Sequence, residues 1–236
     1  MSNDFKVKLQ AIVEQLDSDF RVQGQQDIDS ILQAGVSSYD DLLVILQNPK
    51  VNTDRGTKVC WALSRLGDQR AVPTLLAALR DKNPDLRSVA AKSLGELNGK
   101  QAVYPLITAL YEDESLEVRV AAAYALGLLG DDKAVEPLVS ILSDRTQEPR
   151  VRGMAAEALS DINDSRAITP LIAALTDVSV EVRFWAAFAL GKLGNRQALP
   201  ELERLAATDE TILPGWWAVS REATEAIQRI QEREAV

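Results

Sequence analysis

Few residues in this sequence could carry out chemistry. The 236 residues include no histidine and one cysteine, Cys60. The lack of histidine removes the commonest general base, the Ser-His-Asp and Cys-His arrangements, and the commonest transition-metal ligand. No pair of carboxylates shares a helix turn that would face the groove of the predicted fold, so none is placed to act as acid and base. We therefore predict no catalytic residue, metal or cofactor, and no small-molecule turnover by the isolated chain.

Cys60 and an acidic run remain as possible exceptions. Cys60 aligns with a row of small residues, which favours a buried small side chain over the alternative, a reactive or metal-binding thiol. The run Glu112-Asp113-Glu114 could hold a cation, but a solvated loop between helices is the better interpretation.

Four arginines recur at nearly even spacing and could form an anion-binding ladder. An aspartate also precedes each of them, at positions 81, 113, 144 and 177. Because each aspartate could pair with an arginine along a stack of repeats, we favour a structural role for the arginines. They are Arg87, Arg119, Arg152 and Arg183.

The arginines belong to an internal repeat. Its clearest copy, from Glu117 to Leu142, reads EVRVAAAYALGLLGDDKAVEPLVSIL, and related segments begin at Asp85, Pro149 and Glu181. A fixed period of this kind is the signature of a repeat array. The period is also visible in the prolines, which step by 32, 32 and 33 residues through Pro73, Pro105, Pro137 and Pro170.

Each repeat contains two helical patterns. The first has apolar residues three and four apart at 122, 125, 126 and 129, and Gly130 is a typical helix terminator. The second begins close to Pro137, where a missing N–H costs little, and it has an apolar face at Leu138, Ile141 and Leu142. Such a helical hairpin must stack on its neighbours to bury both faces.

We therefore predict an all-α fold, a right-handed superhelical α-solenoid of about seven stacked antiparallel helical hairpins forming one domain over residues 1–236. Residues 1–37 are expected to form a degenerate N-terminal cap, and residues 38–205 the core repeats. Residues 206–236 form an atypical C-terminal hairpin with an insertion, Thr208 to Trp217, before a final helix from Ser220 to Arg233.

Composition narrows the classes of partner. A formal charge of −9 and a pI near 4.7 disfavour nucleic acid, which needs clustered lysine and arginine. A neutral or basic protein partner fits better. The sequence predicts neither a signal peptide nor membrane insertion, and one cysteine fits a reducing compartment. We expect a cytoplasmic protein.

The repeat signature of Arg, Ala-Ala, two Leu-Gly pairs and Ala-Val-x-Pro-Leu resembles the short HEAT-like repeat named after phycobilisome lyases. The resemblance is strong over about residues 56–205. It implies a solenoid whose concave surface is lined by one helix of each repeat, the helix that carries the Leu-Gly pair or its equivalent. We call these the Leu-Gly helices. That family includes subunits that attach bilins to phycobiliproteins, proteins that help dismantle phycobilisomes, and adaptors without chemistry.

Variable side chains on the Leu-Gly helices mark a candidate binding face. The position five residues after each arginine lies off the apolar stripe and should face the concave groove. The alternative is that packing between repeats buries the same side chains in a small secondary core. The predicted contact residues at this position are Trp61, Lys92, Tyr124, Glu157 and Phe188. One turn earlier the same face carries Phe184, with Trp185 beside it, and Trp216 and Trp217 are a possible second contact.

Two functional hypotheses follow. The first is a non-catalytic protein-binding scaffold, possibly in phycobiliprotein or cofactor assembly or turnover, whose partner is a phycobiliprotein or a second HEAT-like subunit. The alternative is enzymatic: a subunit of a bilin lyase or isomerase, with phycocyanobilin as bound substrate. In that case the nucleophilic cysteine belongs to the acceptor protein, and the lyase contributes mainly by positioning the reactants.

Overall fold

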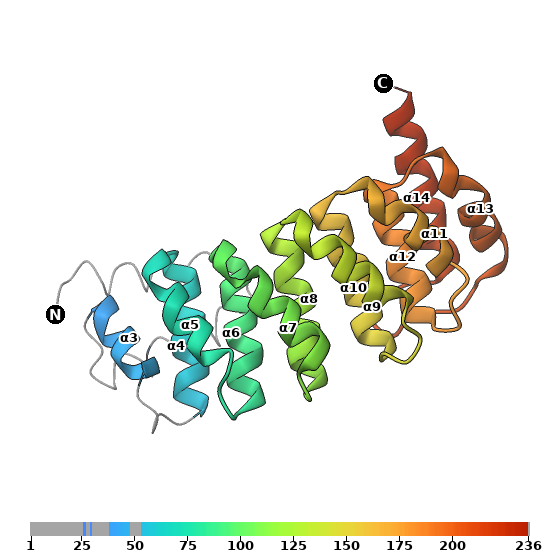
Figure 1. Cartoon of the computed structure of the whole chain (residues 1–236). Helices are drawn as coiled ribbons and strands as arrows, with labels where there is room; N and C mark the ends of the chain where they lie inside the picture. Colours follow the sequence, from blue (N-terminus) through green and yellow to red (C-terminus); the bar gives the residue numbers. More distant parts are fainter. Residues whose placement is uncertain (1–25, 27–28, 30–37, 48–52, 236) are drawn as a thin grey trace. The chain divides into compact units, whose positions relative to one another are not determined.

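The described part of the chain forms an all-α solenoid of helical hairpins, as predicted (Figure 1). A computed structural model describes residues 26, 29, 38–47 and 53–235. Most of the predicted cap, residues 1–37, lies outside these residues. The chain divides into two compact units, residues 1–105 and 106–236, and each is described by itself.

Unit 1 contains two consecutive hairpins. The first joins α3 (Tyr39–Gln47) to α4 (Thr53–Leu66), and the second joins α5 (Val72–Ala78) to α6 (Pro84–Glu96). Helix α4 packs against α6, so the Leu-Gly helices of neighbouring repeats lie side by side. The next helix, α7 (Val103–Glu112), begins at the end of this unit.

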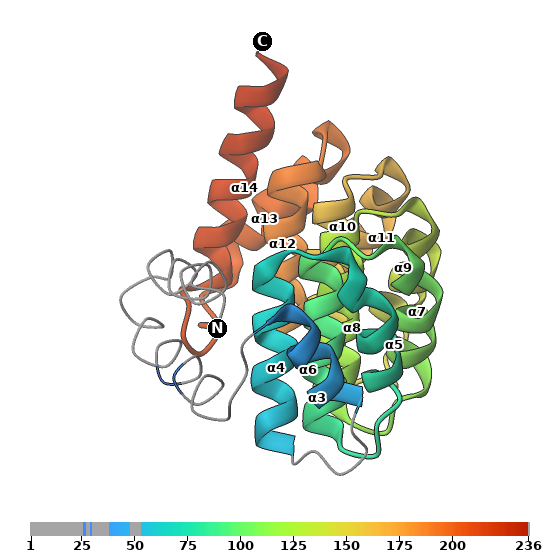
Figure 2. The ribbon, with the colours of Figure 1, turned by 90° about the vertical axis from the view of Figure 1, so that its left-hand side faces the viewer.

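Unit 2 repeats the same arrangement in two layers. One layer consists of the Leu-Gly helices and α14, each packed against the next, and the other consists of α9, α11 and α13 (Figure 2). The bounds are α8 (Leu116–Leu129), α9 (Val135–Ser143), α10 (Pro149–Ile162), α11 (Ile168–Ala174), α12 (Val180–Leu193), α13 (Leu199–Thr208) and α14 (Val219–Glu234).

The turns between repeats follow the sequence closely. A 3-10 turn precedes each of α5, α7, α9, α11 and α13, as at Asp132–Ala134, where the Asp131 carboxylate accepts a hydrogen bond from the Lys133 N–H. Gly130 ends α8 with φ of 59°, a left-handed conformation that favours glycine. Pro137 is the third residue of α9, confirming the predicted start of that helix.

Small residues allow the Leu-Gly helices to approach closely. A Cβ atom at Gly127 in α8 would lie 2.9 Å from the Cα of Ala158 in α10, so the two backbones touch at this point. Leu126 is fully buried beside this contact. The apolar stripe predicted from the sequence is therefore the core of the stack.

The C-terminal hairpin has the predicted insertion. After α13, residues 209–218 form a loop closed by a single antiparallel bridge between Ile212 and Ala218. Helix α14 then starts at Val219, one residue before the expected start. No helix of the described residues is both long and apolar enough to cross a membrane.

Candidate protein-interaction face

The position five residues after each repeat arginine lies at the surface of its helix. We call these side chains the outer row. Trp61, Tyr124, Glu157 and Phe188 are half-buried, and Lys92 is exposed. Trp61 and Lys92 lie in unit 1, and the other three lie in unit 2. The placement off the core stripe agrees with the sequence, whereas the binding role remains a prediction.

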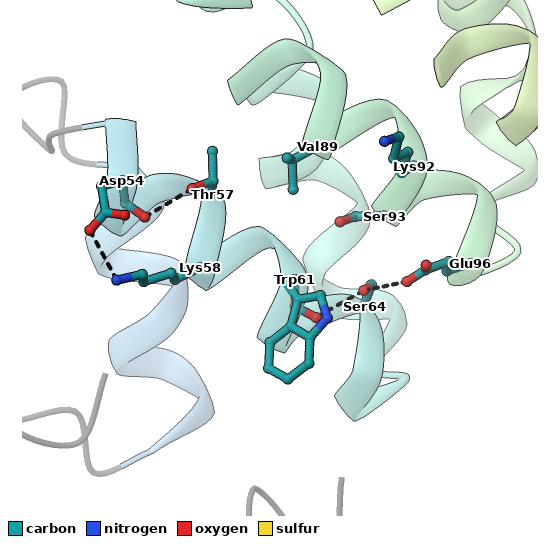
Figure 3. Close-up of a pocket in the computed structure, with 9 residues that line it drawn as sticks. All are labelled: Asp54, Thr57, Lys58, Trp61, Ser64, Val89, Lys92, Ser93 and Glu96. Atoms are coloured by element: carbon teal, nitrogen blue, oxygen red, sulfur yellow. Dashed lines mark hydrogen bonds and ion pairs between the residues drawn. The ribbon is translucent and has the colours of Figure 1, made fainter. Parts of the chain in front are cut away.

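In unit 1 the outer row borders an open cleft of about 350 Å³ between α4 and α6 (Figure 3). Trp61 enters from α4 and Lys92 from α6, with Val89 between the two helices. The cleft therefore combines an aromatic wall with a basic side chain. It is lined by Asp54, Thr57, Lys58, Trp61, Ser64, Val89, Lys92, Ser93 and Glu96.

Most of the polar lining of this cleft is already engaged within the protein. Lys58 Nζ lies 3.0 Å from Asp54 Oδ2, and the Ser64 hydroxyl donates to Glu96 Oε2 at 2.7 Å (Figure 3). The Ser93 hydroxyl donates to the Cys60 carbonyl at 3.1 Å. The bonds made by Ser64 and Ser93 join α4 to α6, so the cleft is a preformed part of the repeat stack.

In unit 2 five aromatic residues form one continuous cluster: Phe184, Trp185, Phe188, Trp216 and Trp217. The rings of Trp185 and Phe188, on α12, have centroids 5.5 Å apart, and Trp216 of the insertion lies 5.2 Å from Trp185. Both contacts are edge-to-face, at 80° and 76°, which is a favourable geometry for aromatic pairs. Trp216 is 46% exposed.

The insertion is shaped to place its two tryptophans in different environments. Gly215 has φ of +84°, and the Trp216 N–H donates to the Leu213 carbonyl at 2.9 Å. Trp217 is half-buried, and its indole N–H donates to Glu222 Oε2 at 2.9 Å. Glu222 is fully buried in α14. Trp217 thus anchors the loop, while Trp216 faces solvent.

Phe184 is a core residue, and its predicted place on the binding face is wrong. It is fully buried, with its ring 5.6 Å from that of Trp216 and 6.0 Å from that of Trp217. The equivalent position in α10 is Gly153, which is also buried. The physical reason is that this position, one turn before the outer row, is covered by the neighbouring element: Trp185 over Gly153, and the insertion over Phe184.

Charged side chains surround the aromatic cluster. Lys192 Nζ lies 5.4 Å from the centre of the Phe188 ring and 2.6 Å from Asp161 Oδ1. Arg221 lies over the Trp217 ring at 4.7 Å. Both arrangements are cation–π contacts. The protein's own cations therefore already occupy two rings of the cluster.

Two half-buried carboxylates lie near these rings, and the sequence singled out only Glu157. Burial raises the pKa of Glu157, as does the nearby charge of Asp161, while Lys192 lowers it. Burial also raises the pKa of Glu181, against the opposing charge of Arg150. Glu181 was missed because it occupies the same position as exposed Glu117 in the preceding α8 repeat. In the α12 repeat it lies with Trp185 over Gly153.

The repeat arginines have structural roles, and Arg152 forms an ion pair of the predicted kind with an aspartate of the next repeat. Arg87, Arg119 and Arg183 each donate to the carbonyl of the preceding aspartate at 2.9 Å. Arg152 instead forms a buried bidentate pair with Asp177 of the next repeat, at 2.5 and 3.1 Å. The guanidinium groups thus fasten loops and neighbouring repeats.

The remaining chemical candidates offer no reactive group. Cys60 is fully buried, and burial raises the pKa of its thiol to about 12, confirming the buried interpretation. Asp113, from the acidic run, accepts a hydrogen bond from the Ser115 N–H. Within the described residues, no three His, Cys, Asp or Glu side chains group as a metal site.

Comparison with solved structures finds several proteins of similar fold. The complex of CpcE and CpcF of phycocyanin lyase from Nostoc sp. PCC7120 is 27% identical, with a TM-score of 0.60, over 73% of this chain and 70% of that one. A designed armadillo repeat protein in complex with the peptide (KR)4 is 22% identical, with a TM-score of 0.57, over 82% of this chain and all of that one. An engineered protein is 20% identical, with a TM-score of 0.53, over 95% of this chain and 67% of that one.

No curated protein matches the sequence. The model of the family described as HEAT repeats matches five overlapping segments, at residues 39–115, 73–148, 103–180, 144–213 and 168–236. Together these segments cover every repeat seen in the structure. This chain belongs to the HEAT-repeat family.

Proposed function

We propose that this protein is a non-catalytic scaffold that binds a protein partner through the faces of its Leu-Gly helices. The observation that carries the proposal is Trp216. It is 46% exposed and held against Trp185 by an insertion that has no counterpart in the other repeats. An exposed tryptophan fixed by its own loop is typical of an interface anchor.

The chemistry of the chain supports a neutral or basic partner in the cytoplasm. The formal charge is −9, so electrostatic attraction would bring a basic surface toward the protein. Among the similar structures is a complex of two chains of a phycocyanin lyase. A phycobiliprotein or a second HEAT-like subunit is therefore the partner class that we propose. We further propose that residues 1–236 act as one domain with residues 1–37 as its cap.

The test is quantitative capture of partners from an extract of the source cells. Trp216→Ala, Tyr124→Ala and Phe188→Ala should each weaken partner binding by more than about 1 kcal/mol. Val178→Ala is the control, because Val178 is 83% exposed and lies outside the aromatic cluster. Circular dichroism and melting temperature should stay nearly unchanged in all four variants. Equal capture by all variants would overturn the proposal.

The alternative function is that of a bilin lyase or isomerase subunit within the phycobilisome lyase group of HEAT-like proteins. The 27% identity to the phycocyanin lyase complex favours it. The cleft beside Trp61 and Lys92 offers an aromatic wall and a cation, which suit a flat ring system carrying carboxylates. The nucleophilic cysteine would come from the acceptor protein.

This alternative is tested by mixing the purified protein with phycocyanobilin and apo-phycocyanin. Covalent product formed well above the spontaneous rate would establish the lyase function and displace the scaffold proposal. Lys92→Ala and Trp61→Phe would then show whether the unit 1 cleft holds the bilin. Product formed only at the spontaneous rate would remove the alternative for the isolated chain.

A further inference from the structure

Two indole rings of the unit 2 cluster lack the cation that their neighbours have. Lys192 lies over Phe188 and Arg221 over Trp217. Between those rings, Trp185 and Trp216 meet edge to face at 5.2 Å, and no lysine or arginine of the described chain lies over either of them. A tryptophan face is the strongest of the aromatic cation acceptors. The pair thus offers an unused binding surface for a cation.

A carboxylate that makes no ion pair within the described residues lies beside the Trp185 ring. Glu181 and Trp185 are one turn apart on α12 and both lie over Gly153: a Cβ atom there would be 3.2 Å from Glu181 Cγ and 2.9 Å from Trp185 Cδ1. Arg150, whose charge lowers the pKa of Glu181 against the effect of burial, donates to both carboxylate oxygens of Glu117. No group of the described chain donates a hydrogen bond to the Glu181 carboxylate.

We propose that Trp185, Trp216 and Glu181 form a site for a cationic side chain, arginine or lysine, from a basic segment of the partner. The inference rests on the proposed scaffold function, because it names the chemistry that the aromatic face recognises. The cation would stack on the two indoles, and Glu181 would neutralise its charge. An arginine side chain satisfies both needs, since it stacks on aromatic faces and donates to carboxylates.

The half-buried state of Glu181 favours a cation over an apolar occupant. An apolar side chain on the indoles would remove more water from a carboxylate that burial already disfavours, as its raised pKa shows. A guanidinium or ammonium group would instead replace that water with an ion pair and hydrogen bonds. The net negative charge of the chain also favours a cationic occupant.

The direct test is an NMR titration of the indole N–H signals with N-acetyl-arginine amide. The chain has four tryptophans, so Trp185→Phe and Trp216→Phe assign the two signals of interest, and Trp61 in the other unit is the internal reference. We expect the Trp185 and Trp216 signals to shift together with arginine, while N-acetyl-citrulline amide, which is nearly isosteric but neutral, leaves them in place. Equal shifts with citrulline would overturn the proposal.

Matched variants separate the site from general attraction to an acidic chain. Glu181→Gln should weaken arginine binding by roughly 3–10-fold, the range of a cation–π contact with its counter-ion. Glu203→Gln makes the same change in net charge on an exposed part of α13 and should change binding by less than about twofold. Equal losses in the two variants, or an equal shift of the Trp61 signal, would also overturn the site.

The partner-capture experiment distinguishes failure of the proposed cation site from failure of the scaffold proposal. If Trp216→Ala weakens partner capture while Glu181→Gln does not, the face binds a partner through apolar contacts, and the cation site is wrong. If neither variant changes capture although arginine shifts both indole signals, the cation site stands and the scaffold assignment to this face fails.

Discussion

The indole of Trp185 in α12 fills the space that a side chain at Gly153 in α10 would occupy. A Cβ atom at Gly153 would lie only 2.9 Å from Trp185 Cδ1. The glycine is therefore what allows a tryptophan to lie across the joint between two repeats. In this way a residue of one repeat sets the position of a candidate contact residue in the next.

Replacing Gly153 by alanine should displace the Trp185 ring. Because a side chain can rotate away, and because alanine favours a helix by about 1 kcal/mol over glycine, we expect only a small net change in the free energy of unfolding. The readout is fluorescence: acrylamide should quench Trp185 more strongly in the variant. Gly127→Ala is the comparison, since its Cβ would meet the Ala158 backbone at 2.9 Å. It should destabilise by about 1–3 kcal/mol. Equal stability of both variants would contradict this packing.

Breaking the ion pair between Arg152 and Asp177 should be costly, because both side chains are buried, at 3% and 6% exposure. Arg152→Met leaves a buried carboxylate without its partner and should lower the free energy of unfolding by about 3–5 kcal/mol in urea melts. The double variant Arg152→Met/Asp177→Leu removes both charges and should be less destabilised. A double variant as unstable as the sum of the single changes would show that the pair does not act as a unit.

The same pair should make stability sensitive to acid. Burial would raise the pKa of Asp177, but hydrogen bonds from Arg152 and the Ser179 N–H, with the charge of Arg152, lower it below its usual value of 3.8. The pair's contribution to stability is therefore present above pH 3.8 and is lost as the pH falls through the lowered pKa. The Arg152→Met/Asp177→Leu variant should show a smaller loss of stability over that range.

Glu222 should have the opposite pH dependence. Burial raises its pKa above 4.5, although bonds from Trp217 and Arg229 and the charge of Arg229 oppose the shift. Between 4.5 and the raised value the folded state binds more protons, so stability should fall as the pH rises through this window. Glu222→Gln keeps an acceptor for the Trp217 N–H and should flatten this part of the stability curve. A curve identical to that of the unmodified protein would show that Glu222 is not the group responsible.

The thiol of Cys60 should resist modification in the folded protein. It is fully buried, with a pKa raised to about 12, and only the thiolate is nucleophilic. A thiol-specific reagent such as Ellman's should react with less than a few per cent of the protein at pH 8 and with all of it in denaturing urea. Rapid reaction of the folded protein at the rate of a free thiol would show that α4 opens locally.

The sequence by itself determined the repeat, its period and the fold class. Gly130 ends its helix because glycine readily adopts the left-handed backbone conformation, and proline is tolerated near a helix start because the N–H that it lacks would have no partner there. Both effects are local, so these residues mark the helix ends without any knowledge of packing. The core stripe around Leu126 follows from helical spacing alone. A regular array also places each outer-row residue by counting from its arginine.

Only the tertiary structure decided which of the candidate side chains are covered. Phe184 and Trp185 are adjacent in the sequence, yet one is fully buried and the other half-exposed, because the first lies beneath an insertion with no repeat equivalent. An aspartate precedes each of the four repeat arginines, but the structure decided that Arg152 and Asp177 form a buried pair. Glu181 became a candidate because it and Trp185, one turn apart on α12, both lie over Gly153 of the preceding repeat. Burial and pairing depend on which groups neighbouring elements bring into contact, and a repeat pattern specifies those contacts only where the pattern is kept.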